Sequence, residues 1–132
     1  MSKSDVRQRL LRRGIDEETA SDTVEWLENI GILNDEEYSA MLVRHYAAKG
    51  YGEGRIKNEL FRHGIEKDLW NNALENMPDM DEEAYLLLCK KLSGWNGDED
   101  TLRKASEALR RRGFSWDEVR YAAEKLRSEI RN

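Results

Sequence analysis

The sequence predicts an all-α fold built from tandem three-helix repeats in an elongated arrangement. Three observations predict it. A turn sequence recurs at intervals of 50 and 49 residues, apolar residues follow helical spacing between the turns, and no segment shows the alternation of a β-strand. The single proline and the nine glycines fall mostly between the periodic segments, as is typical of helices joined by short turns. We therefore expect about eight helices, with the first repeat lacking its first helix.

The recurring turn centres on Gly14, Gly64 and Gly113. In each copy a leucine lies four residues before the glycine, an arginine lies two before it, a large apolar residue follows it directly, and an acid lies four after it. This pattern predicts a helix that ends in a Schellman turn, in which the glycine adopts a positive φ and the next residue packs back on the leucine. The three glycines are therefore expected to be structural turns.

The helices between these turns begin at capping or acidic residues. Asp16 and Ser115 are suited to cap the helices that follow two of the glycines, and Ser115 belongs to a capping box, whereas Glu66 is a poorer cap. The acids at 35–37 and 81–83 favour helix starts because the helix dipole attracts negative charge there. The expected helices are 5–13, 17–30, 35–49, 53–63, 67–76, 81–92, 99–112 and 116–131.

Aligning the turns divides the chain into three repeats. Residues 5–33 make a partial first repeat, which begins where its second helix would be. Residues 34–78 make a full second repeat, and residues 79–132 make a full third one. Each small bundle buries little apolar surface by itself, so neighbouring repeats are expected to stabilise one another.

Composition excludes several classes of protein. The 27 acidic and 22 basic side chains leave a net charge of −5, and no apolar run approaches the ~20 residues that span a bilayer. The lone Cys89 suits a reducing compartment, so we expect a cytoplasmic monomer without membrane contact. Neither His45 nor His63 lies in a metal-binding spacing, and no phosphate loop or dinucleotide fingerprint is present. The sequence therefore predicts no enzymatic activity and no catalytic, metal or cofactor site.

Basic residues gather on the corresponding helix of each repeat. The candidates for contact with a partner or with DNA are Arg12, Arg13, Arg55, Lys57, Arg62, Arg110, Arg111 and Arg112. Two interpretations fit them: cations late in a helix complement its dipole, or stacked repeats align them as a stripe that meets phosphates or a protein. Because the chain as a whole is acidic, a partner of mixed charge suits such a stripe better than naked DNA does.

The aromatic residues fall into two groups. One group lies at helical spacing and is expected in the core, namely Trp26, Tyr38, Tyr46, Trp70 and Tyr121. Tyr51 and Trp95 instead lie in glycine-rich breaks between helices. An exposed ring in such a break anchors a protein partner or stacks on a base. These two are therefore candidate contact residues, with core packing as the alternative.

The ordered set of motifs resembles the RecX family of bacterial recombination regulators. The resemblance rests on LNDEEY at 33–38, KGYG at 49–52, RIKNEL at 55–60 and GI at 64–65, with LLRRG at 10–14 and RGFS at 112–115. It extends from about residue 5 to residue 130. Asn34 and His63 stand where an aspartate and a lysine are common in the family.

The resemblance implies a protein of tandem three-helix units that binds the RecA recombinase filament on single-stranded DNA. Such a protein limits the strand exchange, ATPase and coprotease activities of RecA in DNA repair, recombination and the SOS response. A weak direct contact with DNA is compatible with this role. Two alternatives stay open at this point: a helical-repeat protein that binds DNA directly through its basic residues, and an adaptor with an unrelated protein partner.

Overall fold

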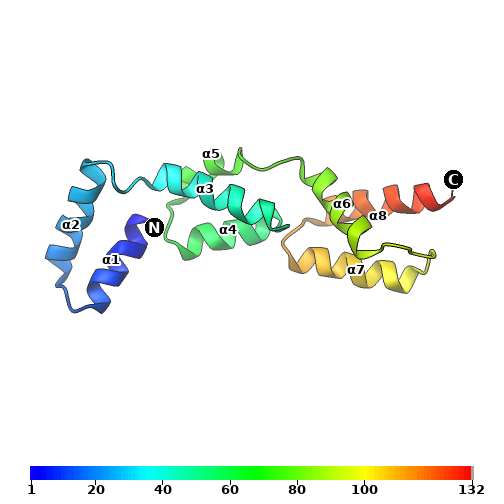
Figure 1. Cartoon of the computed structure of the whole chain (residues 1–132), viewed down its shortest axis with the longest axis horizontal. Coiled ribbons are helices and arrows are strands. Elements are labelled where there is room, and N and C mark those ends of the chain that lie inside the picture. Colours follow the sequence, from blue (N-terminus) through cyan, green and yellow to red (C-terminus); the bar gives the residue numbers. More distant parts are fainter. Residues whose placement is uncertain (132) are drawn as a thin grey trace. The chain divides into compact units, whose positions relative to one another are not determined.

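The computed structural model describes the backbone of residues 1–131 and is all-α over that range (Figure 1). The helices are α1 Lys3–Arg12, α2 Glu17–Asn29, α3 Asp35–Ala48, α4 Glu53–Arg62, the 3-10 helix η1 Lys67–Leu69, α5 Trp70–Leu74, α6 Met80–Lys91, α7 Glu99–Arg111 and α8 Trp116–Arg131. The prediction of an all-α fold with about eight helices is confirmed, and each expected helix end lies within two residues of the observed one.

The starts of the first and fifth helices differ from the expectation for reasons of capping. Helix α1 begins at Lys3 because Ser2 and Asp5 form a reciprocal capping box. The Ser2 hydroxyl oxygen accepts from the Asp5 N–H at 2.9 Å, and the Asp5 carboxylate accepts from the Ser2 N–H at 3.2 Å. The fifth helix begins as the 3-10 turn η1, and Glu66 before it makes no side-chain cap. A 3-10 turn is a common way to satisfy the first groups of a helix that lacks a cap.

The three recurring glycines have positive φ angles of 87° at Gly14, 71° at Gly64 and 99° at Gly113. The N–H of the residue after each glycine donates to the carbonyl of the leucine that lies four residues before that glycine, at 3.0 to 3.2 Å. Each glycine N–H donates to a carbonyl three residues back. These are the two hydrogen bonds of a Schellman turn, so each glycine ends its helix in a conformation that other residues adopt only with strain.

The chain divides into two compact units. The first unit is Met1–Arg44 with Lys57–Asn76, and the second is His45–Ile56 with Met77–Asn132. In the first unit α1 and α2 form a helical hairpin (Figure 1). In the second unit α6 packs against both α7 and α8.

The N-terminus of α1 packs on the turn that ends α4, within the first unit. The Ser2 hydroxyl donates to the His63 carbonyl, and His63 Nδ1 lies 2.8 Å from an Asp5 carboxylate oxygen. The Tyr38 ring meets the His63 ring edge-on, with centroids 5.8 Å apart. A Cβ on Gly64 would overlap the side chain at the start of α1, so the two segments are in close contact.

We expect acid to weaken this junction through Asp5. Burial raises the pKa of the Asp5 carboxyl, but hydrogen bonds from His63 and from the Ser2 N–H outweigh burial, so its pKa lies below the ordinary value. A carboxyl whose folded-state pKa is depressed contributes stability that is fully present above its unfolded pKa of about 3.9. That contribution is lost as the pH falls through the folded-state pKa.

Asp5→Asn is therefore expected to lower the free energy of unfolding by about 1 kcal/mol at neutral pH. It should also flatten the pH dependence of the urea midpoint below about pH 5. Asp22→Asn is the matched control, because Asp22 is an exposed aspartate of the same unit. A midpoint that falls with acid as steeply in Asp5→Asn as in the unaltered chain would contradict this role of Asp5.

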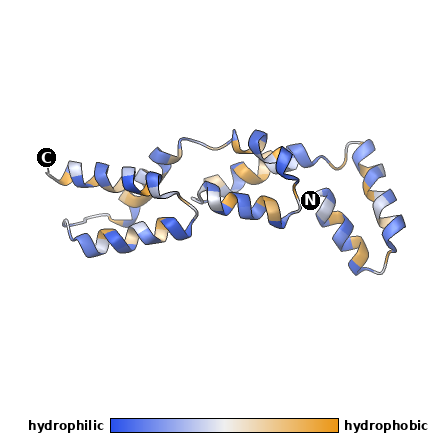
Figure 2. Cartoon of the chain, turned by 180° about the vertical axis from the view of Figure 1, so that it is seen from behind, coloured by the Kyte–Doolittle hydropathy of each residue, from blue (hydrophilic) through white to orange (hydrophobic). Residues whose placement is uncertain are grey.

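The hydrophobic core of the second unit lies among α6, α7 and α8. Its buried members are Ala84, Leu88, Leu92, Leu102, Leu109, Phe114, Val119, Ala122, Ala123 and Leu126. Figure 2 shows orange and blue residues along both α7 and α8, as expected for amphipathic helices with one buried face. Leu109 and Phe114, the pair that the Schellman turn brings together, are 0% and 1% exposed.

The start of α4 packs on the turn that follows α7. The Gly52 N–H donates to the Arg112 carbonyl at 2.8 Å, and the Gly54 N–H donates to the Gly113 carbonyl at 3.1 Å. The first N–H groups and the last carbonyls of a helix lack hydrogen-bond partners within that helix. Here the N–H groups at the start of α4 and the carbonyls after α7 are partners for one another. The approach is close enough that a Cβ on Gly113 would overlap the backbone nitrogen of Arg55.

Two of the aromatic residues expected in the core lie on the surface. Trp26 is 60% exposed and Tyr121 is 40% exposed. Tyr38, Tyr46 and Trp70 are partly buried. Helical spacing identifies the face on which a residue lies, but it does not show whether a neighbouring helix covers that residue.

Candidate partner interface

Tyr51 is the centre of an aromatic and basic cluster in the second unit. The Arg55 guanidinium lies 4.9 Å from the centroid of the Tyr51 ring, and the Arg112 guanidinium lies 5.4 Å from it. The Tyr46 ring packs edge-on at a centroid distance of 5.9 Å. Both guanidinium distances are within the range of a cation–π interaction. We call Tyr46, Tyr51, Arg55 and Arg112 the Tyr51 cluster.

Local backbone geometry positions the Tyr51 cluster. Gly50 has a φ of 88°, and the Tyr51 N–H donates to the Tyr46 carbonyl at 3.1 Å, so α3 ends in the same kind of turn as the three recurring ones. Arg112 Nη1 donates to the Lys49 carbonyl at 3.2 Å. A cation at the C-terminal end of a helix complements the helix dipole. The Arg112 guanidinium therefore caps α3 while its face lies against Tyr51.

A second pair of arginine and aromatic residue lies at the start of α8. The Arg110 guanidinium lies 4.8 Å from the Trp116 ring, and Arg110 Nη1 donates to the Phe114 carbonyl at 2.9 Å. Trp116 is 59% exposed. Sequence patterns alone did not single out Trp116. The signal that points to it is an arginine six positions earlier, which the Schellman turn folds back over the first turn of α8.

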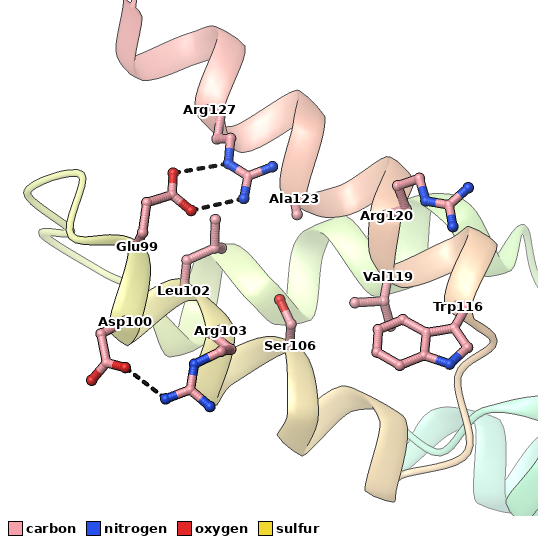
Figure 3. A pocket seen from close by; sticks show the side chains of 10 residues that line it. All are labelled: Glu99, Asp100, Leu102, Arg103, Ser106, Trp116, Val119, Arg120, Ala123 and Arg127. Carbon is pink, nitrogen blue, oxygen red and sulfur yellow. Dashed lines mark hydrogen bonds and ion pairs between the residues drawn. The ribbon is translucent and has the colours of Figure 1, made fainter.

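Trp116 also lines a pocket of about 620 Å³ formed by α7 and α8 (Figure 3). Leu102, Val119 and Ala123 supply its apolar lining. The cations at the pocket are already paired within the chain. Arg127 donates to both carboxylate oxygens of Glu99, at 3.1 and 2.8 Å. The pocket therefore presents an apolar floor with a largely neutralised rim rather than a site for an anion.

The ion pairs at this rim shift the pKa values of their members. Arg103 lies 2.6 Å from Asp100, and its hydrogen bond holds the pKa of the Asp100 carboxyl below the ordinary value. The hydrogen bond to Glu99 raises the pKa of Arg127. These shifts favour the charged forms of the Asp100 carboxyl and the Arg127 guanidinium.

The remaining basic candidates are exposed. Arg12 and Arg13 lie at the end of α1, Lys57 and Arg62 lie on α4, and Arg111 lies at the end of α7. The side chain of Arg62 is 71% exposed. Of the ten candidate contact residues, three lie together, because the guanidinium groups of Arg55 and Arg112 lie over the Tyr51 ring. A fourth, Arg110, stacks on Trp116.

Trp95 is half-buried in the loop before α7. Its indole N–H donates to the Asp98 carbonyl at 2.8 Å, and its ring packs against the core of the second unit. Asp98 in turn caps α7 by accepting from the Asp100 N–H. The ring therefore fixes the loop on which α7 begins.

Comparison with known proteins decides the family of this chain. Residues 34–74 match the family model described as RecX, second three-helix domain. Over 92% of its length, the chain is 35% identical to Regulatory protein RecX of Xanthomonas campestris pv. campestris (strain B100), of which the match covers 76%. The chain belongs to the RecX family. Residues 34–74 contain α3, α4, η1 and α5, so the matched RecX domain corresponds to one complete set of three helical segments.

Further RecX relatives agree. The chain is 34% identical to Regulatory protein RecX of Xanthomonas citri and 32% identical to that of Stenotrophomonas maltophilia (strain R551-3). Each match covers 92% of this chain and 76% of the relative. The predicted resemblance is confirmed, and so is the prediction of a regulatory protein rather than an enzyme.

The described residues offer neither a metal-binding cluster nor a membrane-spanning helix. Within the described part of the chain, no three or more His, Cys, Asp or Glu side chains are grouped so that they could hold a metal ion. None of the helices in residues 1–131 has both the length and the apolar character needed to cross a membrane. The surface features of this RecX-family chain are thus its exposed basic residues, its arginine and aromatic clusters and its exposed apolar side chains.

Proposed function

We propose that this RecX-family chain binds the RecA filament on single-stranded DNA and limits the activity of RecA. The observation that carries the proposal is the match to regulatory RecX proteins over 92% of the chain. The charge distribution supports it, because exposed arginines on a chain of net charge −5 suit a partner that carries both protein and DNA surfaces. Such filaments form in the cytoplasm, where the chain would act.

The proposed contact is multivalent. The repeats at 5–33, 34–78 and 79–132 each present basic side chains, and each would meet a neighbouring RecA protomer. Weak contacts then add through effective concentration, so a monomer is sufficient. In the second unit the Tyr51 cluster is the proposed anchor, because tyrosine and arginine supply much of the binding energy at protein interfaces.

Hydrolysis of ATP by RecA on single-stranded DNA, measured while the chain is titrated in, tests this proposal. We expect inhibition with fewer chains than RecA protomers. Tyr51→Ala should raise the half-inhibiting concentration about tenfold, because losing one interface anchor costs about 1–2 kcal/mol. Tyr121→Ala removes another partly exposed ring, on α8, and should inhibit like the unaltered chain. No inhibition at any excess would contradict RecA regulation, and equal inhibition by all three proteins would contradict the role of Tyr51.

Direct contact with single-stranded DNA is a second candidate function. The geometry that favours it is the Tyr51 ring with guanidinium groups 4.9 and 5.4 Å from its centroid, since proteins bind single strands with aromatic rings and adjacent cations. An adaptor role with an unrelated protein partner is the third candidate. It would be favoured if neither RecA inhibition nor DNA binding were observed.

Replacing Arg110, Arg111 and Arg112 together by alanine tests direct DNA binding. If these arginines bind phosphates, affinity for an oligonucleotide without RecA should fall, and the slope of log affinity against log salt should decrease by about 0.7 for each phosphate that is no longer neutralised. Fluorescence anisotropy of a labelled oligonucleotide at several salt concentrations measures both quantities. A shallow slope in the unaltered chain would count against direct binding of DNA by these side chains.

A further inference from the structure

A small apolar pocket lies beside the Tyr51 ring in the second unit. Its volume is about 170 Å³. The end of α3 lines it with Ala47, α6 lines it with Leu86 and Leu87, and Phe114 of the core lines it too. Leu86 is 51% exposed, so the pocket opens to solvent. Tyr51 therefore borders an apolar pocket in addition to its contacts with two guanidinium groups.

The volume of this pocket limits what it can hold. Pockets that bind small molecules measure about 300–1,000 Å³. An apolar cavity of about 150 Å³, engineered in another protein, binds a single benzene molecule. With about 170 Å³, the pocket beside Tyr51 is too small for a typical small-molecule ligand and accommodates one large apolar side chain.

The lining of the pocket suits an apolar side chain better than a nucleobase of similar size. On α6 the lining residues share one face of the helix, and they are Met80, Glu83, Leu86, Leu87 and Lys90. The leucines offer no hydrogen bonds to the polar edge of a base. A base inserted among them would leave polar atoms unpaired, which is costly, whereas a leucine or phenylalanine side chain has no such atoms.

The charges around the pocket are mostly positive. The two guanidinium groups of the Tyr51 cluster lie over the ring that borders the pocket. Lys49 Nζ lies 6.0 Å from the centroid of the Tyr46 ring of the same cluster. Lys90 is exposed, and among the described side chains it forms no salt bridge. The acid in the lining is Glu83. A segment with carboxylates beside its apolar side chain complements these charges.

We infer that this pocket receives a leucine or phenylalanine side chain from an acidic segment of the partner protein. The apolar side chain enters the pocket beside Tyr51, and acidic residues next to it in the segment meet Lys90 and the guanidinium groups of the Tyr51 cluster. The inference rests on the proposed function for the identity of the partner, a RecA protomer, and adds the chemistry of the contact.

Binding of a model segment to the full chain tests the pocket without RecA. The probe is a peptide of about ten residues, which is the length of a short extended recognition segment, with one central phenylalanine flanked by glutamates and serines. One comparison peptide has serine in place of the phenylalanine, and another has lysine in place of every glutamate. In NMR spectra of the chain, the probe should shift the amide signals of Ala47 and Leu86. Both comparison peptides should bind at least about tenfold more weakly.

Filling the pocket should block the probe. Ala47→Met places a longer side chain in the space that the phenylalanine would occupy, so it should weaken binding of the probe at least about tenfold. Ala48→Met is the matched control, because it adds the same side chain at the next position of α3, which is exposed and outside the lining. The control should bind the probe with unchanged affinity.

Removing an exposed wall of the pocket provides a second variant with little effect on the core. Leu86→Ser should also weaken binding of the probe, and its melting temperature should stay within about 2 °C of that of the unaltered chain. Ile130→Ser is the control, because Ile130 is 46% exposed in the same unit and does not line the pocket. It should bind the probe like the unaltered chain.

Hydrolysis of ATP by RecA separates this inference from the proposed function. Ala47→Met should raise the half-inhibiting concentration about tenfold, and Ala48→Met should leave it unchanged. Equal inhibition by both variants and the unaltered chain would overturn the inference and leave RecA regulation intact. Binding of the probe without any inhibition of RecA would support the pocket and contradict RecA regulation.

Two further outcomes would overturn the inference. One is equal binding of the probe and of the peptide that lacks phenylalanine, because the pocket would then contribute nothing. The other is a shift of the Ala47 and Leu86 signals by oligothymidylate that Ala47→Met abolishes, because a base would then occupy the pocket.

Discussion

Gly113→Ala is expected to destabilise the protein by about 3 kcal/mol or more, and Gly14→Ala by only about 1 kcal/mol. Both glycines end a helix in the same turn, with φ angles of 99° and 87°. They differ in their surroundings. A Cβ on Gly113 would overlap the backbone nitrogen of Arg55, whereas a Cβ on Gly14 would meet nothing within 4 Å. Both substitutions lower the free energy of unfolding because alanine is strained in a left-handed backbone conformation. Gly113→Ala lowers it further because the new Cβ displaces the start of α4.

Urea unfolding followed by helical circular dichroism measures both variants. The free energy of unfolding of Gly14→Ala serves as the reference for the conformational cost alone. Gly113→Ala should show the larger loss and, because Arg55 moves with the start of α4, should also weaken RecA inhibition through the Tyr51 cluster. Equal losses of stability in the two variants would contradict the close approach of α4 to the turn after α7.

The features of the fold that could be predicted from the sequence are those determined by short segments. The hydrogen bonds of a Schellman turn join residues at most five apart, so the recurring leucine, glycine and apolar residue contain the whole signal. The caps are equally local. Asp16 accepts from the Thr19 N–H at 3.1 Å, and Ser115 accepts from the Glu118 N–H at 3.2 Å, as predicted. Helix ends could therefore be located without knowledge of tertiary packing.

Contacts between distant segments could not be predicted in this way. Arg55 is four residues from Tyr51, but Arg112 reaches that ring only because the start of α4 docks on the turn after α7. The exposure of Trp26 has the same origin. Its spacing on α2 matches that of a core residue, and only the arrangement of the helices in residues 1–131 shows that Trp26 is exposed there.

Alanine substitutions at the two phenylalanines of the chain measure how much the core of the second unit contributes to stability. Phe114 is 1% exposed and packs among α6, α7 and α8, whereas Phe61 on α4 is 72% exposed. Phe114→Ala should lower the free energy of unfolding by about 3–5 kcal/mol, because it removes apolar contact and leaves a cavity. Phe61→Ala should change it by less than about 0.5 kcal/mol. Urea unfolding of both variants measures the difference.

The same pair connects the core to the proposed regulation of RecA. Phe114 follows the turn on which the start of α4 docks, so a loosened core should also disturb the Tyr51 cluster. Phe114→Ala is therefore expected to lose stability and RecA inhibition together. Phe61→Ala should retain both. If Phe61→Ala lost inhibition at unchanged stability, the exposed ring on α4 would itself belong to the RecA contact, and the Tyr51 cluster could not be its sole aromatic anchor.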